Sequence, residues 1–390
     1  MSYSAARIHR GLQYQCPEPA YWELIIETTG ASQDFSIDIA GSSVNITIDW
    51  GDGGAAVNYT TTGTKTCTYT IAGTYTVKIS GSIVGGSIGC TYATAPRLKA
   101  TGVIGGITGL SDFKCTFYGC TGLSSIPKDL FRYYPNVTAW AFNSTFEYCS
   151  GLASIPDDLF RYNTEVGEYG FYFTFAGCTG LTSVPENLFR HNALVAASGF
   201  YGTFKGCTGL TSVPANLFRY NTAVSNSGFR LTFNGCTGLT SVPENLFRYN
   251  TAVSDYGFNQ TFNGCTGLTS LPTDLFRYNT LVGYSGFYKT FNGCTGLTSL
   301  PANLFRYNTL VGSSGFYKTF YGCNNLQLNP WIFYASGEES TRFASPVPAQ
   351  NFTECFKLTG AFGGSQGTAP ALWDCTFNGT PTKDNCFAGH

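Results

Sequence analysis

The sequence predicts an α+β repeat protein, in which a small N-terminal β-sandwich is followed by a curved solenoid of about eight 29-residue units. Two observations carry this prediction. Cysteine recurs every 29 residues in one context, as in TFNGCTGLTSLPANLFRYNT from Thr290 to Thr309. The segment before the repeats instead alternates apolar with polar residues. The first pattern is typical of stacked repeats, and the second is typical of half-buried strands.

The first part of each repeat unit is predicted to be a helix. Phe stands seven and three residues before each repeated cysteine, and Leu stands three residues after it. Offsets of four, three and three residues trace one face of a helix. Gly stands two residues after most of these cysteines, as at Gly209, and we expect it to stop the helix in the left-handed conformation. The repeated residues, called the ladder cysteines below, are Cys120, Cys149, Cys178, Cys207, Cys236, Cys265, Cys294 and Cys323.

The second part of each unit is predicted to hold one short parallel strand, in LTSVP or LTSLP, and one further helical turn. Pro opens this turn, where its missing N–H costs nothing. Leu188, Phe189 and Val195 exemplify its core positions. Such a unit cannot bury its apolar side alone, so the units must stack. Strands stack about 4.8 Å apart and helices about 8 to 10 Å apart, so the stack should curve with its strands inside.

Residues 21–88 are predicted to form the β-sandwich. The stretches YWELIIETT, DFSIDIA, SVNITIDWGDG and CTYTIAGTYTVKISG alternate apolar and polar residues, as strands with one buried face do. Asp49 and Asp52 lie in the Gly-rich turn IDWGDG. Two carboxylates fall short of the roughly six to eight oxygen ligands that Ca²⁺ takes, so we interpret them as turn residues rather than a metal site.

The rest of the chain is divided by its pattern. Residues 1–20 are predicted to be an N-terminal arm, residues 89–335 the solenoid, and residues 336–390 a degenerate repeat that caps its open end. The cap keeps a Phe three residues before Cys355 and a Leu three residues after it. No apolar leader region and no run of 18 or more apolar residues occurs, so neither a signal peptide nor a membrane-spanning helix is expected.

The composition argues against a function based on charge. Lys and Arg number 22 against 23 Asp and Glu, and only 12% of residues are charged, so we do not expect nucleic acid as a partner. Aromatic residues reach 16% and Gly numbers 47, which indicates an ordered chain rich in turns and aromatic packing.

Two segments resemble known families. The motif TFxGCTGLTSxPxxLF, over about residues 98–334, resembles the BspA-like subgroup of bacterial leucine-rich repeats, whose shorter units carry an F-x-x-C-x-x-L core. IDWGDG followed by YTIAGTYTVKI resembles the PKD domain, an immunoglobulin-like module, although Cys67 stands where that family usually has His. These resemblances imply a leucine-rich-repeat solenoid behind an immunoglobulin-like sandwich. They also imply a bacterial surface protein or a phage tail-associated protein.

Catalytic and metal-binding patterns are not found, and we expect no enzyme activity and no cofactor. His9, His191 and His390 lie far apart, and H-E-x-x-H, G-x-S-x-G and P-loop motifs are absent. C-x-x-C is also absent, and Cys115 with Cys120 forms one isolated C-x₄-C. Equivalent side chains of stacked units point the same way, so we interpret the ladder cysteines as buried, reduced and structural rather than disulfide-bonded.

Arginine forms a second ladder. Five of its members follow an acidic residue by three or four positions, so a solvated structural stripe is favoured over a groove for polyanions. The members are Arg132, Arg161, Arg190, Arg219, Arg248, Arg277 and Arg306.

The positions that differ between units supply the candidate ligand-binding residues. The two residues after the first Phe of each unit vary, and so do the pair two and three residues before it. Such variation implies exposure, and Tyr, Asn, Ser and Arg recognise partners at low entropic cost. Neutral drift explains the same variation equally well. The candidates are Tyr172, Tyr201, Arg230, Asn259, Tyr288, Lys289, Tyr317 and Lys318.

Together these patterns predict a non-enzymatic recognition or adhesion protein in an extracellular setting, on a virion or a cell surface. Its variable face would bind a cell-surface glycan or protein receptor, and its N-terminal arm would dock to virion or surface-assembly proteins. A phage tail-associated host-binding protein is favoured, because no leader is expected. Two alternatives stay open: a structural or decorating component of an extracellular or viral assembly, and a bacterial adhesin whose leader precedes this sequence.

Overall fold

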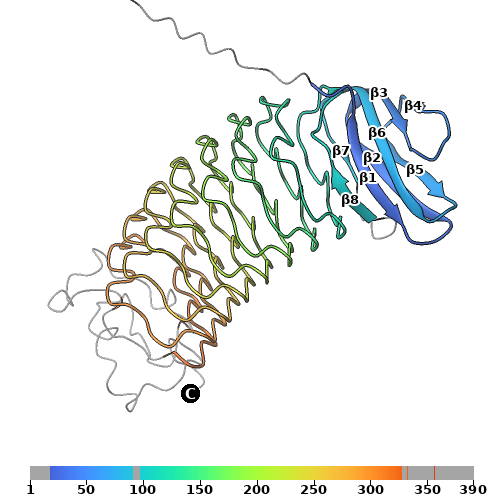
Figure 1. The fold of residues 1–390 in the computed structure, drawn as a ribbon. Helices are drawn as coiled ribbons and strands as arrows, with labels where there is room; N and C mark the ends of the chain where they lie inside the picture. Colours follow the sequence, from blue (N-terminus) through green and yellow to red (C-terminus); the bar gives the residue numbers. More distant parts are fainter. Residues whose placement is uncertain (1–17, 91–96, 327–331, 333–354, 356–390) are drawn as a thin grey trace, which may run out of the picture.

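The computed structural model describes residues 18–90, 97–326, 332 and 355. Figure 1 shows a β-sheet region at one end and, extending from it along a gently curved axis, a stack of similar windings of the chain. The predicted arm, apart from residues 18–20, lies outside the described residues. So does the predicted cap, apart from Cys355.

The described residues contain nine strands in two sheets. The larger sheet has the order β4-β3-β6-β1-β8, with β9 also paired to β6, and the smaller has the order β5-β2-β7. Pairing is antiparallel except between β6 and β9. The strands are β1 (Trp22–Thr28), β2 (Gln33–Ile39), β3 (Ser42–Asp49), β4 (Val57–Tyr59), β5 (Gly63–Tyr69), β6 (Gly73–Val84), β7 (Ile88–Gly89), β8 (Arg97–Thr101) and β9 (Ile107–Thr108). Thus β8 and β9, which lie beyond the predicted domain boundary at residue 88, also join the larger sheet.

The sheets bury the apolar residues of each alternating pattern and lead directly into the windings. In β1, Leu24 and Ile26 are fully buried while Ile25 between them is 39% exposed. Both sheets contribute to one hydrophobic core that continues into the repeats. Trp22 meets Phe117 of the first unit edge-on, with 5.7 Å between the ring centroids. The sheet region therefore covers the N-terminal end of the stack.

The prediction of an α+β leucine-rich-repeat solenoid is wrong. No helix occurs in the part of the chain that the structure describes, and the regular secondary structure there is β. The second helical turn of each unit is also replaced by turns, as where Leu217 N–H donates to Pro214 O at 3.3 Å. Of the expected parallel strands, the described units retain one isolated bridge, between Ser241 and Ser270.

A ribbon of consecutive turns stands where the first helix was predicted. Alternate N–H groups donate to the carbonyl three residues earlier, as from Tyr172 to Tyr169 at 3.2 Å. The N–H groups between them donate to the next winding, as from Phe171 to Gly199 at 2.9 Å. Half of the ribbon's donors therefore join neighbouring windings, whereas a helix would satisfy nearly all of them internally.

Left-handed residues recur at every fourth position of this ribbon and explain why no helix forms. In one unit they are Tyr169, Phe173 and Gly177, with φ of 54°, 51° and 72°. Each interrupts the run of right-handed residues that a helix needs. A four-residue period still places Phe171 and Phe175 on the same side, as a helix would. The apolar spacing therefore indicated the correct buried face but the wrong element.

The glycine two residues after the ladder cysteine does not have the predicted left-handed role. In the unit of Gly209, the left-handed glycines are Gly202 and Gly206, with φ of 62° and 72°. A Cβ on Gly209 would instead lie 2.5 Å from the carbonyl oxygen of Thr179 in the preceding winding. Gly suits this position because two backbones approach closely, and Asn325 replaces it in the last of these units.

Stacked phenylalanine rings fill the centre of the windings. Phe171 stacks on Phe200 with 5.7 Å between centroids and 5° between planes. Phe189 stacks on Phe218 with 6.0 Å and 8°. All four rings are fully buried. Each unit thus repeats the same packing against the next, and Phe burial supplies much of the hydrophobic driving force.

Buried threonine and cysteine side chains add polar contacts between windings. Thr203 Oγ1 donates to Phe171 O at 2.8 Å, and Cys207 Sγ lies 3.1 Å from Phe175 O. Equivalent contacts recur along the stack. The cysteine therefore does more than fill space, because its S–H donates weakly to a carbonyl of the preceding winding.

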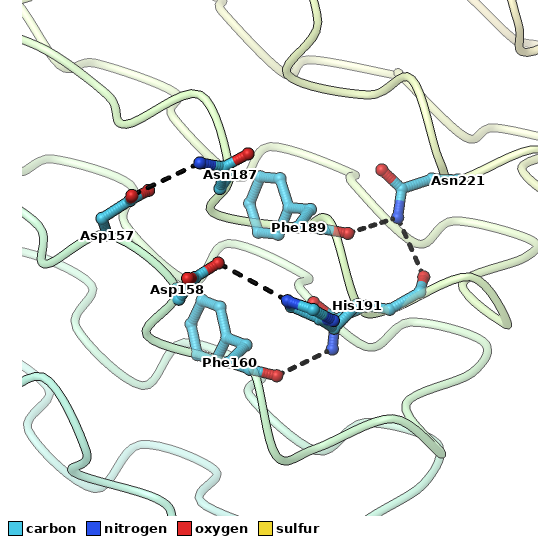
Figure 2. Close-up of polar contacts among 8 residues, drawn as sticks. Asp157, Asp158, Phe160, Asn187, Phe189, His191 and Asn221 are labelled. Carbon is cyan, nitrogen blue, oxygen red and sulfur yellow. Dashed lines mark hydrogen bonds and ion pairs between the residues drawn. The ribbon is translucent and has the colours of Figure 1, made fainter. Parts of the chain in front are cut away.

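The asparagine of each RYN segment forms a further buried ladder, shown in Figure 2. Asn221 Nδ2 donates to Phe189 O at 3.0 Å and to Asn192 O at 2.9 Å. Both amide hydrogens are thereby used, and the side chain is fully buried. Each of these carbonyl groups also accepts a backbone N–H, from Asn192 at 3.2 Å and from Val195 at 3.3 Å, so the ladder adds a second hydrogen bond that joins neighbouring windings.

Candidate recognition surface

Three positions of the turn ribbon that vary between units supply the residues of the candidate surface. We name them by their distance before the ladder cysteine. The −9 column is Trp140, Tyr169, Ser198, Ser227, Tyr256, Ser285 and Ser314, and the −6 column is Asn143, Tyr172, Tyr201, Arg230, Asn259, Tyr288 and Tyr317. The −5 column is Ser144, Phe173, Gly202, Leu231, Gln260, Lys289 and Lys318, and all its members have left-handed backbone.

Aromatic residues of the −9 and −6 columns contact one another across successive windings. Trp140 stacks on Tyr169 with 3.9 Å between centroids and 3° between planes. Trp140 also lies 5.5 Å from Tyr172, which stacks on Tyr201 at 4.7 Å and 28°. The structure thus brings candidates Tyr172 and Tyr201 together and adds Trp140 and Tyr169, which were not among the candidates.

Arg230 extends this run. Its guanidinium carbon lies 5.3 Å from the ring centroid of Tyr201 and 5.5 Å from that of Tyr256. Tyr256 in turn meets Tyr284 edge-on at 5.1 Å. Trp140, Tyr169, Tyr172, Tyr201, Arg230, Tyr256 and Tyr284 therefore form one continuous series of ring and cation–π contacts, which we call the aromatic run.

Asn259 does not belong to this surface, although it is in the −6 column. It is 4% exposed, its Nδ2 points to Ser285 O at 3.5 Å, and its Oδ1 accepts from Gln260. Asn143 is similarly buried at 8%. Both stand in units that carry a large aromatic residue in the −9 column. The premise that variable positions are exposed is wrong at these two residues. It is also wrong at four small residues of the −9 and −5 columns, which are likewise buried: Ser144, Ser198, Ser227 and Ser285.

The other four candidates form a second, shorter patch. Tyr288 stacks on Tyr317 with 5.0 Å between centroids and 11° between planes. Lys289 Nζ lies 5.3 Å from the ring of Tyr288, and Lys318 Nζ lies 5.2 Å from that of Tyr317. This patch therefore pairs two phenol rings with two ammonium groups.

Acidic and basic groups are mixed around the aromatic run. Burial raises the pKa of Glu147, although Ser144 and Lys205 oppose the shift. Burial is also the main reason that the pKa of Tyr172 is raised, with a smaller contribution from Tyr201. Lys205 Nζ lies 5.5 Å from the ring of Phe173. The surface is thus partly desolvated, with no strong excess of either charge.

The predicted arginine stripe has a contact pattern that sequence reasoning missed. Arg219 lies over Tyr220 of its own unit at 5.6 Å and over Tyr249 of the next at 5.3 Å. Arg248 repeats this with Tyr249 and Tyr278. The recurring RY dipeptide was the sequence signal from which these contacts could have been predicted. We call this alternating series the Arg–Tyr ladder.

His191 replaces the tyrosine of RYN and interrupts this ladder (Figure 2). Its Nε2 lies 3.6 Å from Asp158 Oδ1 of the preceding winding. The neighbouring Asp157 accepts from Asn187 Nδ2 at 3.3 Å. The two adjacent carboxylates thus have separate partners one winding away, as structural surface residues do.

The ladder cysteines are buried, and none of the cysteines in the described ranges forms a disulfide. Burial raises the pKa of Cys236 to about 12 and that of Cys323 to about 12. The thiols therefore stay protonated near neutral pH, which their S–H contacts with carbonyl groups require.

The side chains of Asp49 and Asp52 stabilise the turn after β3 by accepting nearby backbone N–H groups. Asp49 Oδ1 accepts from Gly51 N–H and Asp52 Oδ1 accepts from Gly54 N–H, each at 3.0 Å. Across the described residues, no group of three or more His, Cys, Asp or Glu side chains is placed to hold a metal ion.

Comparison with models of known protein families gives no match for this sequence, and comparison with curated proteins gives none either. In the part of the chain covered by the structure, no helix is long and apolar enough to cross a membrane.

Proposed function

We propose that this chain is a non-enzymatic recognition protein that binds a cell-surface glycan or protein through its variable columns. The observation that carries the proposal is that variable aromatic side chains contact one another across successive windings, in the aromatic run from Trp140 to Tyr284 and in the patch of Tyr288 and Tyr317. Large aromatic residues and arginine are the side chains that most often dominate binding energy at protein surfaces.

The repeat frame supports the proposal because it holds these side chains in place. The left-handed backbone of the −5 column and the buried Phe on either side of the columns restrict each side chain before any ligand arrives. A ligand that meets ordered side chains loses less conformational entropy on binding. Variation at these positions changes the surface without disturbing the core.

For the setting we propose a virion, with the chain as a tail-associated host-binding protein. The support is the resemblance of the repeats to BspA-like units and of residues 48–79 to PKD domains. An extracellular bacterial adhesin would use the same surface in the same way, so the binding proposal does not depend on this choice.

The proposal is tested by removing the second patch. Replacing Tyr288 and Tyr317 together by Ala in the full chain removes both stacked rings of that patch, and we expect cell binding to fall at least about tenfold. Binding of labelled chain to cells, by flow cytometry, measures this. The matched control replaces Tyr249 and Tyr278 of the Arg–Tyr ladder by Ala.

The outcomes separate recognition from a structural role. Recognition predicts that the Tyr288 and Tyr317 variant loses cell binding but still enters particles isolated from the native source. A structural or decorating protein would instead lose incorporation into the particle and show no cell binding in either form. Unchanged binding in the patch variant, with reduced binding in the control, would move the site to the Arg–Tyr ladder.

A further inference from the structure

Within the aromatic run, two pairs of rings pack face to face. Trp140 and Tyr169 are parallel to within 3°, and Tyr172 and Tyr201 to within 28°. Stacking along the axis leaves ring edges and phenol hydroxyl groups for a ligand. Among the described residues, the hydroxyl groups of Tyr172 and Tyr201 have no hydrogen-bond partner. Aromatic ring edges carry partial positive charge, so the run favours ligands rich in hydrogen-bond acceptors.

Arg230 is the cationic centre of the run. Its guanidinium lies between the rings of Tyr201 and Tyr256, and the residue is half-buried. It forms no ion pair with any described residue. Its Nε is buried and has no hydrogen-bond partner within the described ranges. Among the described residues the guanidinium therefore has no carboxylate partner, and a ligand carboxylate would supply one.

The acidic side chains in this region do not serve as the carboxylate partner of Arg230. Asp255 is adjacent to Tyr256, but its Oδ1 accepts the N–H of Tyr284 at 2.7 Å. The pKa of Glu147 is raised by its burial, and its charge is opposed by Lys205. Glu168 is exposed and makes no ion pair in the described part of the chain. None of these acidic groups therefore pairs with Arg230 within the described ranges.

We propose that the aromatic run binds an acidic polysaccharide lengthwise, with a sugar carboxylate on Arg230. The inference rests on the proposed function and names its ligand class. A linear polymer fits because the run follows the stack from one winding to the next. A carboxylate fits because its two oxygens match the planar fork of the guanidinium. The hydroxyl groups of Tyr172 and Tyr201 then donate to neighbouring sugar oxygens.

The test compares matched pairs of polysaccharides on the full chain. Polygalacturonate, alginate, hyaluronan and polysialic acid are immobilised beside the same polymers with their carboxylates reduced to alcohols. We expect at least one acidic polymer to bind roughly tenfold or more tightly than its reduced form, by surface plasmon resonance. Binding should weaken with added salt, because a charged contact is screened.

Variants of Arg230 locate the contact. Arg230→Gln should lose roughly tenfold or more in affinity for the acidic polymer. Arg230→Lys should recover only part of it, since Lys keeps the charge but not the fork. The matched controls are Arg219→Gln and Arg219→Lys on the Arg–Tyr ladder, where Arg219 also lies between two tyrosine rings. These should bind like the unaltered chain, and equal melting temperatures verify that all variants fold.

Three results would overturn the inference. They are equal binding of the acidic and reduced polymers, equal losses in the Arg230 and Arg219 variants, and binding to an acidic protein but to none of the polysaccharides. In each case the cell-binding assay on Tyr288 and Tyr317 still decides the proposed function separately. If cell binding depends on those tyrosines while Arg230 has no effect, recognition stands and the acidic ligand does not.

Discussion

At the scale of single residues, the stack is held by side-chain donors that point to backbone carbonyls of the preceding winding. Thr203, Cys207 and Asn221 each make such contacts. Their carbonyl partners each also accept a backbone N–H from three residues further along the chain. Removing a side-chain donor therefore costs one net hydrogen bond, about 0.5–1.5 kcal/mol. The ladder cysteine, which looked like a candidate for chemistry, is one of these donors.

The buried thiols make stability depend on pH. The ordinary thiol pKa of 9.0 is raised by burial to about 12 at Cys236 and Cys323, and is also raised at Cys207. The unfolded chain therefore loses these protons first as pH rises. Stability is complete below pH 9 and falls above it, by up to about 1.4 kcal/mol per pH unit for each thiol.

Urea unfolding at pH 7 and pH 10 checks this expectation. The free energy of unfolding should be clearly lower at pH 10. A variant with Cys207→Ala and Cys236→Ala should lose less between the two pH values, because two titrating groups are gone. An identical pH dependence in the variant would show that other groups, such as tyrosines, cause the effect.

At the scale of elements, the turn ribbon is a strand-like surface built from turns. Its alternate N–H groups bond within the winding and to the next one, as those of Tyr172 and Phe171 do. The windings therefore depend on close backbone approach. Gly209 lies at one such approach, beside the carbonyl oxygen of Thr179.

The Gly209→Ala variant tests whether this glycine is needed for the close approach of two backbones or, as predicted from the sequence, for a left-handed helix stop. The added Cβ would lie 2.5 Å from Thr179 O, so we expect the free energy of unfolding to fall by about 1–3 kcal/mol. In the last of these units Asn325 stands at this position, and its Nδ2 donates to Thr295 O at 2.8 Å, a hydrogen bond that Ala cannot form. Gly206→Asn is the matched control, since Asn tolerates the left-handed backbone there. Chemical denaturation measures both, and a smaller loss for Gly209→Ala than for Gly206→Asn would contradict the interpretation.

At the scale of the whole molecule, the sheets cover one end of a stack whose units repeat the same contacts with their neighbours (Figure 1). Trp22 joins the sheet core to the first winding. Stability in such an array is approximately a sum over units and their interfaces. The proposed binding function, in contrast, is local, because the aromatic run occupies particular windings.

Removal of one whole unit separates the contribution of the stack to stability from the contribution of the aromatic run to binding. Deleting residues 208–236 joins Cys207 to Thr237 within an unchanged 29-residue frame and removes Arg230. We expect the chain to fold with slightly lower stability and to lose the polysaccharide affinity. Deleting residues 208–232 is the control, because it breaks the frame and should abolish cooperative unfolding in circular dichroism. If both deletions unfold alike, the units do not stack interchangeably.

Much of the repeat could be predicted from the sequence, and the element type could not. The period, the buried Phe and Leu positions and the structural cysteine follow from spacing alone. The helix prediction failed because Phe171 and Phe175 share a side in a four-residue turn ribbon as well as in a helix. The left-handed backbone at Tyr169 and Phe173 leaves no clear trace in their residue types.

The candidate site was predicted in part. Tyr172, Tyr201 and Arg230 were identified from variation between units, whereas Trp140 and Tyr256 enter the run only through their contacts. Asn259 was included wrongly, because variation does not report exposure.

The sequence by itself determined which residues recur, which face inward and where units differ. Only the tertiary structure decided the hydrogen-bond partner of each N–H group and the neighbours of each variable side chain. The physical reason is that both lie in the next winding. Periodicity reports the side on which a residue lies, but it does not report whether Phe171 N–H bonds within its own turn or to Gly199.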